Sequence, residues 1–193
     1  AACGLYAFCR EADDLVDEGD DPTSALETLH YRLDRVSTRK PQYVATDRVL
    51  TQIVHTYQMP RELLNALLEG FAWDAEGKLY HSIEDVYDYS ARVAGAVGVM
   101  MSVLMGVRDA RTLARAADLG TAMQLTNIAR DVGEDARLGR VYLPMDELKA
   151  EGVDTAKLLG NPTYTDGVGV VTKRLLERAE WLYKRADHGI AQL

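Results

Sequence analysis

Apolar residues recur with the period of an α-helix in most segments of ten or more residues, and the alternation typical of strands is weak. The interruptions are short and polar, and only 153–169, with several Gly and Pro residues, reads as a long irregular stretch. The pattern predicts helices near 4–18, 24–37, 45–58, 60–73, 83–105, 109–136, 145–151 and 165–192. With 193 residues, 47% of them hydrophobic, and no repeat or linker, we expect one all-α domain over residues 1–193.

Two of these helices carry paired aspartates. Asp13 and Asp17 lie four residues apart near the start of the chain, and Asp131 and Asp135 repeat that spacing much later. Residues four apart project from one face of a helix, about one turn apart. Paired carboxylates on two otherwise apolar helices suggest two facing walls that hold divalent cations. Mg²⁺ is bound in this way, through one or two carboxylates, waters and the oxygens of a substrate phosphate.

Each pair extends a polar stripe along its helix. At about 100° per residue, Tyr6 and Arg10 fall within roughly 60° of the first pair, and Gln124 and Asn127 within roughly 80° of the second. A single pair at this spacing is more often a solvated face, but two such stripes together favour a metal and phosphate site. A carboxylate di-iron bundle is a poor alternative, because it requires Glu-x-x-His pairs and the four histidines show no such spacing.

Composition narrows the partners. The chain has 30 acidic and 22 basic residues, a net charge of −8, and no stripe of Lys and Arg, which argues against nucleic acid. A chain this acidic can bind an anionic diphosphate only if metal ions reverse the negative electrostatic potential at the binding site. The longest apolar run, residues 93–106, is too short to span a bilayer and predicts a buried helix. Its small residues, at 94, 95, 96 and 98, indicate either room for a ligand or close helix packing.

Four blocks of sequence are more distinctive than the spacing of the aspartates. They are residues 6–17 (YAFCREADDLVD), 89–98 (YSARVAGAVG), 124–135 (QLTNIARDVGED) and 139–144 (GRVYLP). In this order they resemble the squalene/phytoene synthase family, and the second and third are most similar to bacterial phytoene synthases. Family members usually extend further at both ends, so we expect a leading helix and the last helices of the family to be missing here. The Asp13–Asp17 motif also resembles the DDxxD of chain-elongating prenyltransferases, but the second motif does not repeat it.

The resemblance implies an isoprenoid-synthase (terpenoid synthase) helical bundle with a central cavity for two prenyl diphosphates. It assigns metal binding to five residues, Asp13, Asp17, Asn127, Asp131 and Asp135. It implies catalytic roles for the four aspartates and for Tyr6 and Tyr89. It assigns substrate binding to polar and tunnel-lining positions, namely Arg10, Gln124, Asn127, Arg130, Arg140, Val93, Ala94, Val97 and Gly98. Ser-Ala-Arg after Tyr89 departs from the family's usual Cys-Tyr, which places Arg92 beside the expected tunnel and leaves the prenyl chain length open.

The implied reaction is a Mg²⁺-dependent head-to-head condensation of two geranylgeranyl diphosphates to phytoene through prephytoene diphosphate, with Mn²⁺ as a substitute metal. One alternative is a presqualene diphosphate, squalene or dehydrosqualene synthase that uses farnesyl diphosphate, and NADPH is expected only for a squalene-type reaction. Two further alternatives are a catalytically silent family member that acts in assembly or binding and an unrelated metal-binding bundle. The lipid substrates imply a cytoplasmic protein or one peripheral at the inner face of a membrane, and oligomeric state is left open.

Overall fold

The computed structural model describes residues 1–17 and 21–190, and within these ranges the only regular elements are helices. The prediction of an all-α chain is therefore confirmed. The elements in chain order are α1 (Ala2–Asp17), α2 (Pro22–Ser37), α3 (Ala45–Tyr57), α4 (Arg61–Ala75), α5 (Ile83–Ser90), the π-helix η1 (Ala91–Gly95), α6 (Ala96–Leu104), α7 (Ala110–Arg137), α8 (Met145–Ala150), α9 (Thr155–Gly160) and α10 (Asp166–Ile190). None of these helices is both long and apolar enough to cross a membrane.

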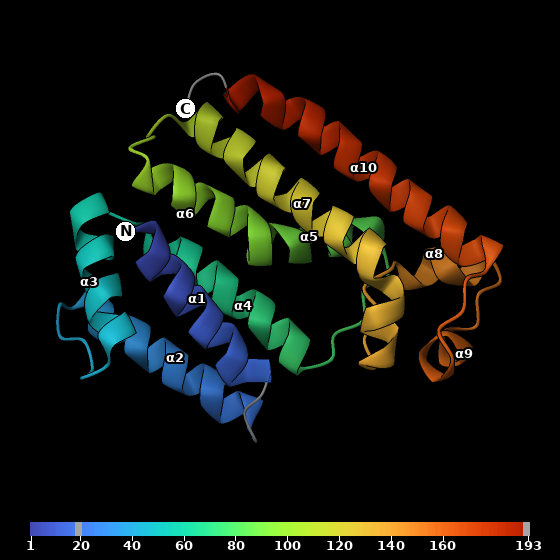
Figure 1. Cartoon of the computed structure of the whole chain (residues 1–193), viewed down its shortest axis with the longest axis horizontal. Coiled ribbons are helices and arrows are strands. Elements are labelled where there is room, and N and C mark those ends of the chain that lie inside the picture. The colour runs from blue at the N-terminus through green and yellow to red at the C-terminus, as the bar shows by residue number, and fades with distance from the viewer. Residues whose placement is uncertain (18–20, 191–193) are drawn as a thin grey trace.

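The N-terminal helices α1 to α4 pack around one apolar core. Leu5 and Phe8 of α1, Leu33 of α2, Leu50 of α3 and Leu68 of α4 are all buried in it. The end of α6 completes this core from the other side. Figure 1 shows the four helices as one group, with α6 above α1 and α4. The stripe of polar residues on α1 is thereby held at a fixed place on the rim of this core.

A second core lies among α5, α7, α8, α9 and α10. The two long helices α7 and α10 run side by side along the upper edge of the molecule (Figure 1), and they bury Leu125 and Leu182 completely. Tyr80, Tyr89 and Leu143 belong to the same core. Since α7 packs against η1, α6 and α10, it passes through the middle of the fold and places its acidic C-terminal half beside the first group of helices.

Glycine determines how closely α7 approaches η1 and α6. A Cβ on Gly120 of α7 would lie 2.3 Å from the carbonyl oxygen of Ala94, and one on Gly98 would lie 2.4 Å from that of Ala116. Both distances are shorter than any real contact of such atoms, so only glycine allows the two backbones to meet here. Gly98 therefore serves close helix packing, one of the two interpretations left open by the sequence.

One element prediction was incomplete and another was wrong. The expected single helix 83–105 is divided by η1, whose wider turn breaks the 3.6-residue register between Tyr89 and Ala96. The stretch 153–169, expected to be irregular, contains α9, which Asp154 caps by accepting the backbone N–H groups of Ala156 and Lys157. The predicted ends at Glu18 and at 191–192 lie outside the described residues.

Candidate active site

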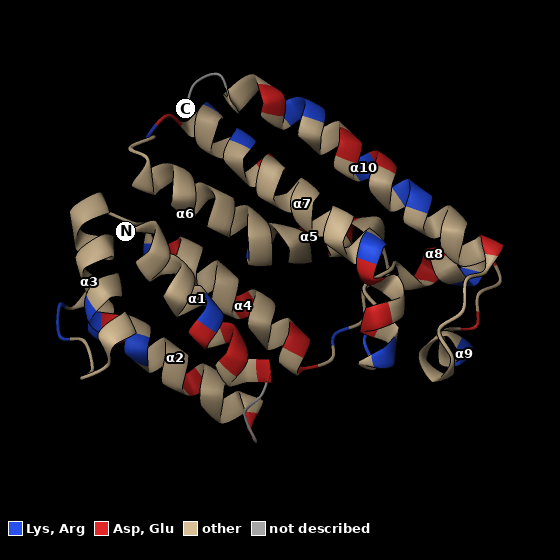
Figure 2. Ribbon diagram, viewed as in Figure 1, with Lys and Arg blue, Asp and Glu red and all other residues tan. Residues whose placement is uncertain are grey.

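The two acidic motifs lie on α1 and α7, and one arginine lies between them. Arg140, just beyond the end of α7, donates from Nη2 to Asp17 Oδ1 at 2.9 Å and from Nη1 to Oδ2 at 3.4 Å. Its charge also acts on the carboxyls of Asp13 and Asp135 and opposes the rise in their pKa values. Arg140 therefore connects the first motif with the second. Figure 2 shows the acidic end of α1 and the mixed charges at the end of α7 on the same side of the molecule.

The other two predicted arginines pair with carboxylates of their own helices. Arg10 contacts Asp13 at 3.3 Å and Asp14 at 2.9 Å, both along α1. Arg130 donates from Nε and Nη2 to the two oxygens of Asp131, at 2.7 and 2.6 Å. This pair of hydrogen bonds lowers the pKa of Asp131. All three predicted arginines are thus bound to aspartate.

Burial and mutual repulsion raise the pKa of two motif carboxyls. Burial raises the pKa of Asp13, and the negative charge of Asp17 adds to the effect. Burial raises the pKa of Asp135 to about 6, with a further contribution from Asp131. Negative charge is therefore crowded here despite Arg140, which is a condition that a bound cation relieves.

The donor types fit Mg²⁺, although the described residues do not form a ready-made cage. No three Asp, Glu, His or Cys side chains in the described part of the chain come close enough to hold one metal ion together. Carboxylate and amide oxygens are nevertheless the hard donors that Mg²⁺ prefers, and it commonly takes only one or two carboxylates and completes its shell with water and substrate phosphate. The crowded carboxyls of both motifs fit that pattern of binding.

A partly buried carboxylate that the sequence did not single out lies beside this junction. Asp74, at the end of α4, accepts a hydrogen bond of 2.7 Å from Tyr89 and another of 2.7 Å from Tyr142. The rings of these two tyrosines are stacked with centroids 5.1 Å apart, and Tyr80 packs 5.2 Å from Tyr89. Burial raises the pKa of Asp74. Burial and the Asp74 charge also raise the pKa of Tyr89 far above its ordinary value, so its hydroxyl stays protonated.

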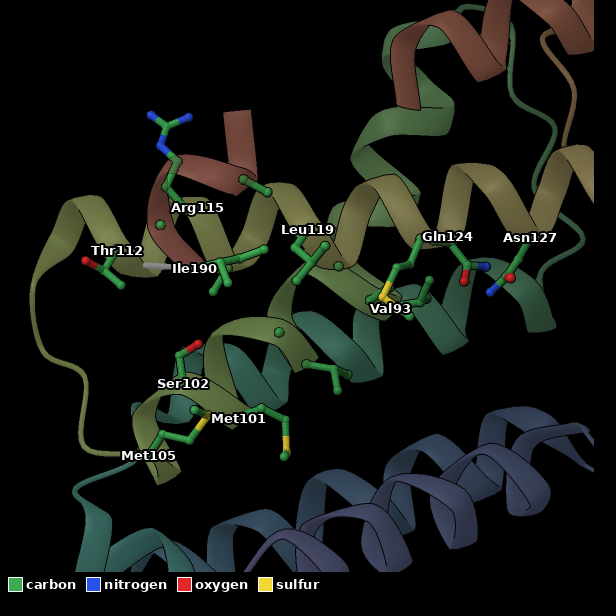
Figure 3. A pocket seen from close by; sticks show the side chains of 18 residues that line it. Val93, Met101, Ser102, Met105, Thr112, Arg115, Leu119, Gln124, Asn127 and Ile190 are labelled. Carbon is green, nitrogen blue, oxygen red and sulfur yellow. The ribbon is translucent and has the colours of Figure 1, made fainter. Parts of the chain in front are cut away.

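An apolar pocket of about 410 Å³ opens along η1, α6, α7 and the end of α10. Figure 3 shows Gln124 and Asn127 at one end of it and Met105 and Thr112 at the other. All four residues expected to line a tunnel do line this pocket, together with the two amides: Val93, Ala94, Val97, Gly98, Gln124 and Asn127. Because Asn127 is followed one turn later by Asp131, the polar end of the pocket leads along α7 to the acidic motif.

Tyr6 is 70% exposed on α1, and Tyr89 is buried. One residue lies elsewhere than the sequence suggests. Arg92 does not border the pocket: its guanidinium pairs with Glu69 at 2.9 Å and lies over the Trp73 ring, 4.2 Å from the centroid. Arg92 and Val93 are consecutive helical residues, so their side chains point in different directions.

Sequence reasoning missed Asp74 and Tyr142 as site residues. Asp74 is a single acid within a helix and has no partner at helical spacing, so the sequence alone carried no signal for it. Tyr142 lies within the recognised block 139–144, next but one to Arg140, and that position could have identified it.

Helices alone, a pair of acidic helices joined by an arginine, and an apolar pocket that ends in amides define the all-α isoprenoid-synthase class. The model of the squalene/phytoene synthase family matches residues 1–193. The chain belongs to this family. It is 54% identical over 195 residues to a phytoene synthase of Rhodobacter capsulatus, covering 100% of this chain and 58% of that protein. A 15-cis-phytoene synthase of a Paracoccus species is 42% identical over 98% of the chain and 64% of its own length.

Solved structures agree with this assignment. A dehydrosqualene synthase determined in complex with a ligand is 32% identical, has a TM-score of 0.87, and is matched over 98% of this chain and 66% of its own. A squalene synthase from Alicyclobacillus acidocaldarius is 28% identical with a TM-score of 0.90, over 98% of this chain and 72% of its own. The chain thus spans about three fifths of the R. capsulatus protein and has the helical fold of these synthases.

Proposed function

We propose that this chain forms the catalytic part of a prenyltransferase that condenses two geranylgeranyl diphosphates head to head into phytoene. The observation that carries the proposal is the continuity along α7 from the apolar pocket, through Gln124 and Asn127, to the acidic motif and Arg140. A substrate with a long hydrocarbon chain and a diphosphate head matches that sequence of environments. Relatives at 54% and 42% identity that are phytoene synthases support the choice of substrate.

In the proposed reaction, C1 of one substrate loses its diphosphate and one proton and forms two C–C bonds, to C2 and C3 of the other substrate's allylic double bond, which gives a cyclopropylcarbinyl diphosphate. Loss of the second diphosphate, rearrangement and loss of a second proton then give phytoene, without a reductant. The chain supplies no nucleophile for these steps. Its part is to bind two chains, to stabilise the departing diphosphates and to keep water away from the carbocations.

The acidic motifs and the arginines would bind the diphosphate end of the substrate. Asp13, Asp17, Asn127, Asp131 and Asp135 would hold Mg²⁺, or Mn²⁺ in its place, and the metal would neutralise and orient the leaving diphosphate. Arg10, Arg130 and Arg140 add planar donors that match phosphate oxygens. Because each arginine is already paired with an aspartate, these side chains are oriented before substrate arrives.

The pocket and the tyrosines would surround the hydrocarbon end of the substrate. The pocket is lined mainly by small and apolar side chains, and each CH₂ group buried there contributes about 0.8 kcal/mol to binding. Asp74 fixes the hydroxyls of Tyr89 and Tyr142, so these rings keep a defined orientation near the acidic junction. Aromatic faces and the exclusion of water both favour a carbocation over its capture by solvent.

Incubation with radiolabelled geranylgeranyl and farnesyl diphosphates, with and without Mg²⁺ and NADPH, tests the proposal. We expect Mg²⁺-dependent phytoene that is lost in Asp13→Ala and in Asp131→Ala. Product from farnesyl diphosphate alone would replace the proposal with a squalene- or dehydrosqualene-type enzyme, the class of both solved relatives. No product from any substrate, in this chain and in a longer chain that includes it, would favour a silent assembly protein.

The lipid substrates and product also lead us to propose peripheral association with a membrane surface, from the cytoplasmic side. Sedimentation with phospholipid vesicles tests this. We expect co-sedimentation that increases when geranylgeranyl diphosphate is present in the vesicles. Equal recovery in the supernatant with and without vesicles, at low and at high salt, would contradict it.

A further inference from the structure

We propose that Lys78 is a further diphosphate-binding residue, one that the family resemblance did not indicate. The inference rests on the proposed function, because it assigns Lys78 to the head group of the same substrate. It is carried by three observations: the cleft in which Lys78 lies, the state of the other cations near the acidic motifs, and the support of the Trp73 ring.

The first observation is a small cleft between two loops. The end of α4 contributes Asp74, the loop after α4 contributes Gly77 and Lys78, and the loop after α7 contributes Gly139, Arg140 and Tyr142. The two glycines have φ angles of +62° and +79°, which lets each loop turn sharply beside the charged residue that follows it. The cleft measures about 50 Å³, too small for a prenyl chain. Lys78 and Arg140 therefore line one space.

The second observation concerns competition between carboxylates and an arriving anion. Arg10, Arg130 and Arg140 are each bound to an aspartate, so a diphosphate must share those arginines with carboxylates. For Lys78, no ion pair within 4.0 Å occurs among the residues that the structure describes. Its Nζ lies instead 3.1 Å from the centroid of the Trp73 ring. Lys78 is therefore a cation at this junction that a diphosphate can engage without displacing a carboxylate.

The binding free energy favours a phosphate oxygen over the Trp73 ring as the partner of the Lys78 ammonium. A cation–π contact at an exposed position is weak, whereas a hydrogen bond between an ammonium and a phosphate oxygen joins two full charges. Lysine also suits the task, because its flexible stem moves a compact charge with three donors. An anion in the cleft therefore draws the Lys78 ammonium away from the ring.

The third observation is that Trp73 remains held when Lys78 leaves it. The guanidinium of Arg92 also lies over the Trp73 ring, at 4.2 Å, and Glu69 holds that guanidinium by an ion pair of 2.9 Å. The ring packs against Tyr80 with centroids 6.5 Å apart. Movement of Lys78 therefore changes the electrostatic environment of an indole that itself stays in place.

This arrangement gives a direct optical test. The chain has two tryptophans, Trp73 and Trp181, so Trp181→Phe leaves Trp73 as the single reporter. Inorganic diphosphate with Mg²⁺ is titrated into this protein while indole emission and calorimetric heat are recorded. We expect saturable binding with a change in emission. In Lys78→Gln the emission change should disappear and Kd should rise about tenfold, while Lys78→Arg should retain most of the affinity.

Lys173→Gln is the matched control. It removes the same charge from an exposed position on α10, where Lys173 reaches only Glu177, at 3.9 Å, and we expect its Kd to equal that of the parent. If the parent binds diphosphate and Lys78→Gln binds it equally well, the assignment of Lys78 is overturned while the proposed function stands. If the parent does not bind diphosphate with Mg²⁺, both are overturned.

Discussion

Removal of the Asp74 carboxylate tests the packing of the tyrosine cluster. Asp74 accepts the hydroxyls of Tyr89 and Tyr142, both at 2.7 Å. In Asp74→Ala these donors lose their acceptor. An unpaired buried donor costs about 1–3 kcal/mol. Tyr89 is only 4% exposed and cannot turn toward water, although its hydroxyl also interacts with that of Tyr142, whereas Tyr142 is half-buried and can turn partly toward water.

The expected loss of unfolding free energy in Asp74→Ala is therefore about 2–4 kcal/mol, reduced somewhat because a buried charge is also removed. Urea unfolding followed by circular dichroism at 25 °C measures it. In a Tyr89→Phe background the same substitution should cost about 1–2 kcal/mol less, because one of the two donors is already absent.

Asp88→Ala is the control for this prediction, since Asp88 is exposed on the neighbouring helix α5, and it should lie within about 0.5 kcal/mol of the parent. A loss below about 0.5 kcal/mol in Asp74→Ala, or equal losses with and without the Tyr89 hydroxyl, would refute the hydrogen-bonded cluster.

Three more changes have defined outcomes. Arg140→Gln removes the link to Asp17 and should lower unfolding free energy by about 1 kcal/mol or less, with a smaller loss at high salt; a salt-independent loss in urea titrations would contradict the electrostatic cause. Gly120→Ala should lower the free energy of unfolding by about 1–3 kcal/mol, because its Cβ would lie 2.3 Å from a facing carbonyl oxygen. Gly133→Ala on the same helix, with nothing nearer than 4.0 Å, should be neutral or stabilising. Equal melting temperatures of the two variants would contradict this. Val97→Phe fills the pocket and should weaken binding of geranylgeranyl diphosphate at least tenfold, which corresponds to about 1.4 kcal/mol. Calorimetry should show unchanged binding of inorganic diphosphate. Equal loss for both ligands would contradict separate regions for the hydrocarbon chain and the diphosphate.

The helical period of the sequence was enough to predict most of the helices, because the apolar residues on the buried face of an amphipathic helix recur every three to four positions in the sequence. Seven of the eight expected helices correspond to single observed helices within a few residues at each described end. The eighth did not, since a π-turn inserts a residue without changing composition. The six-residue α9 was missed because so short a helix shows less than two periods of any pattern.

The candidate site was predicted unevenly. Residues with a repeated spacing, such as Asp131 and Asp135, or within a recognised block, such as Arg140, could be identified. Asp74 could not, because its partners come from α5 and from the loop after α7, and only the fold brings these together. Arg92 was misplaced for a related reason: its direction depends on the register of η1 and on Trp73, not on its neighbours in sequence.

The central claim is that the acidic motifs of α1 and α7 act together on one diphosphate. Calorimetric titration with a non-reactive thiolodiphosphate analogue of geranylgeranyl diphosphate, with and without Mg²⁺, tests it most directly. The account predicts Mg²⁺-dependent binding that weakens at least tenfold in Asp13→Ala and likewise in Asp131→Ala, but not in Asp146→Ala, whose carboxylate is 75% exposed on α8. Binding that needs no Mg²⁺, or that depends on the aspartate of only one helix, would contradict it.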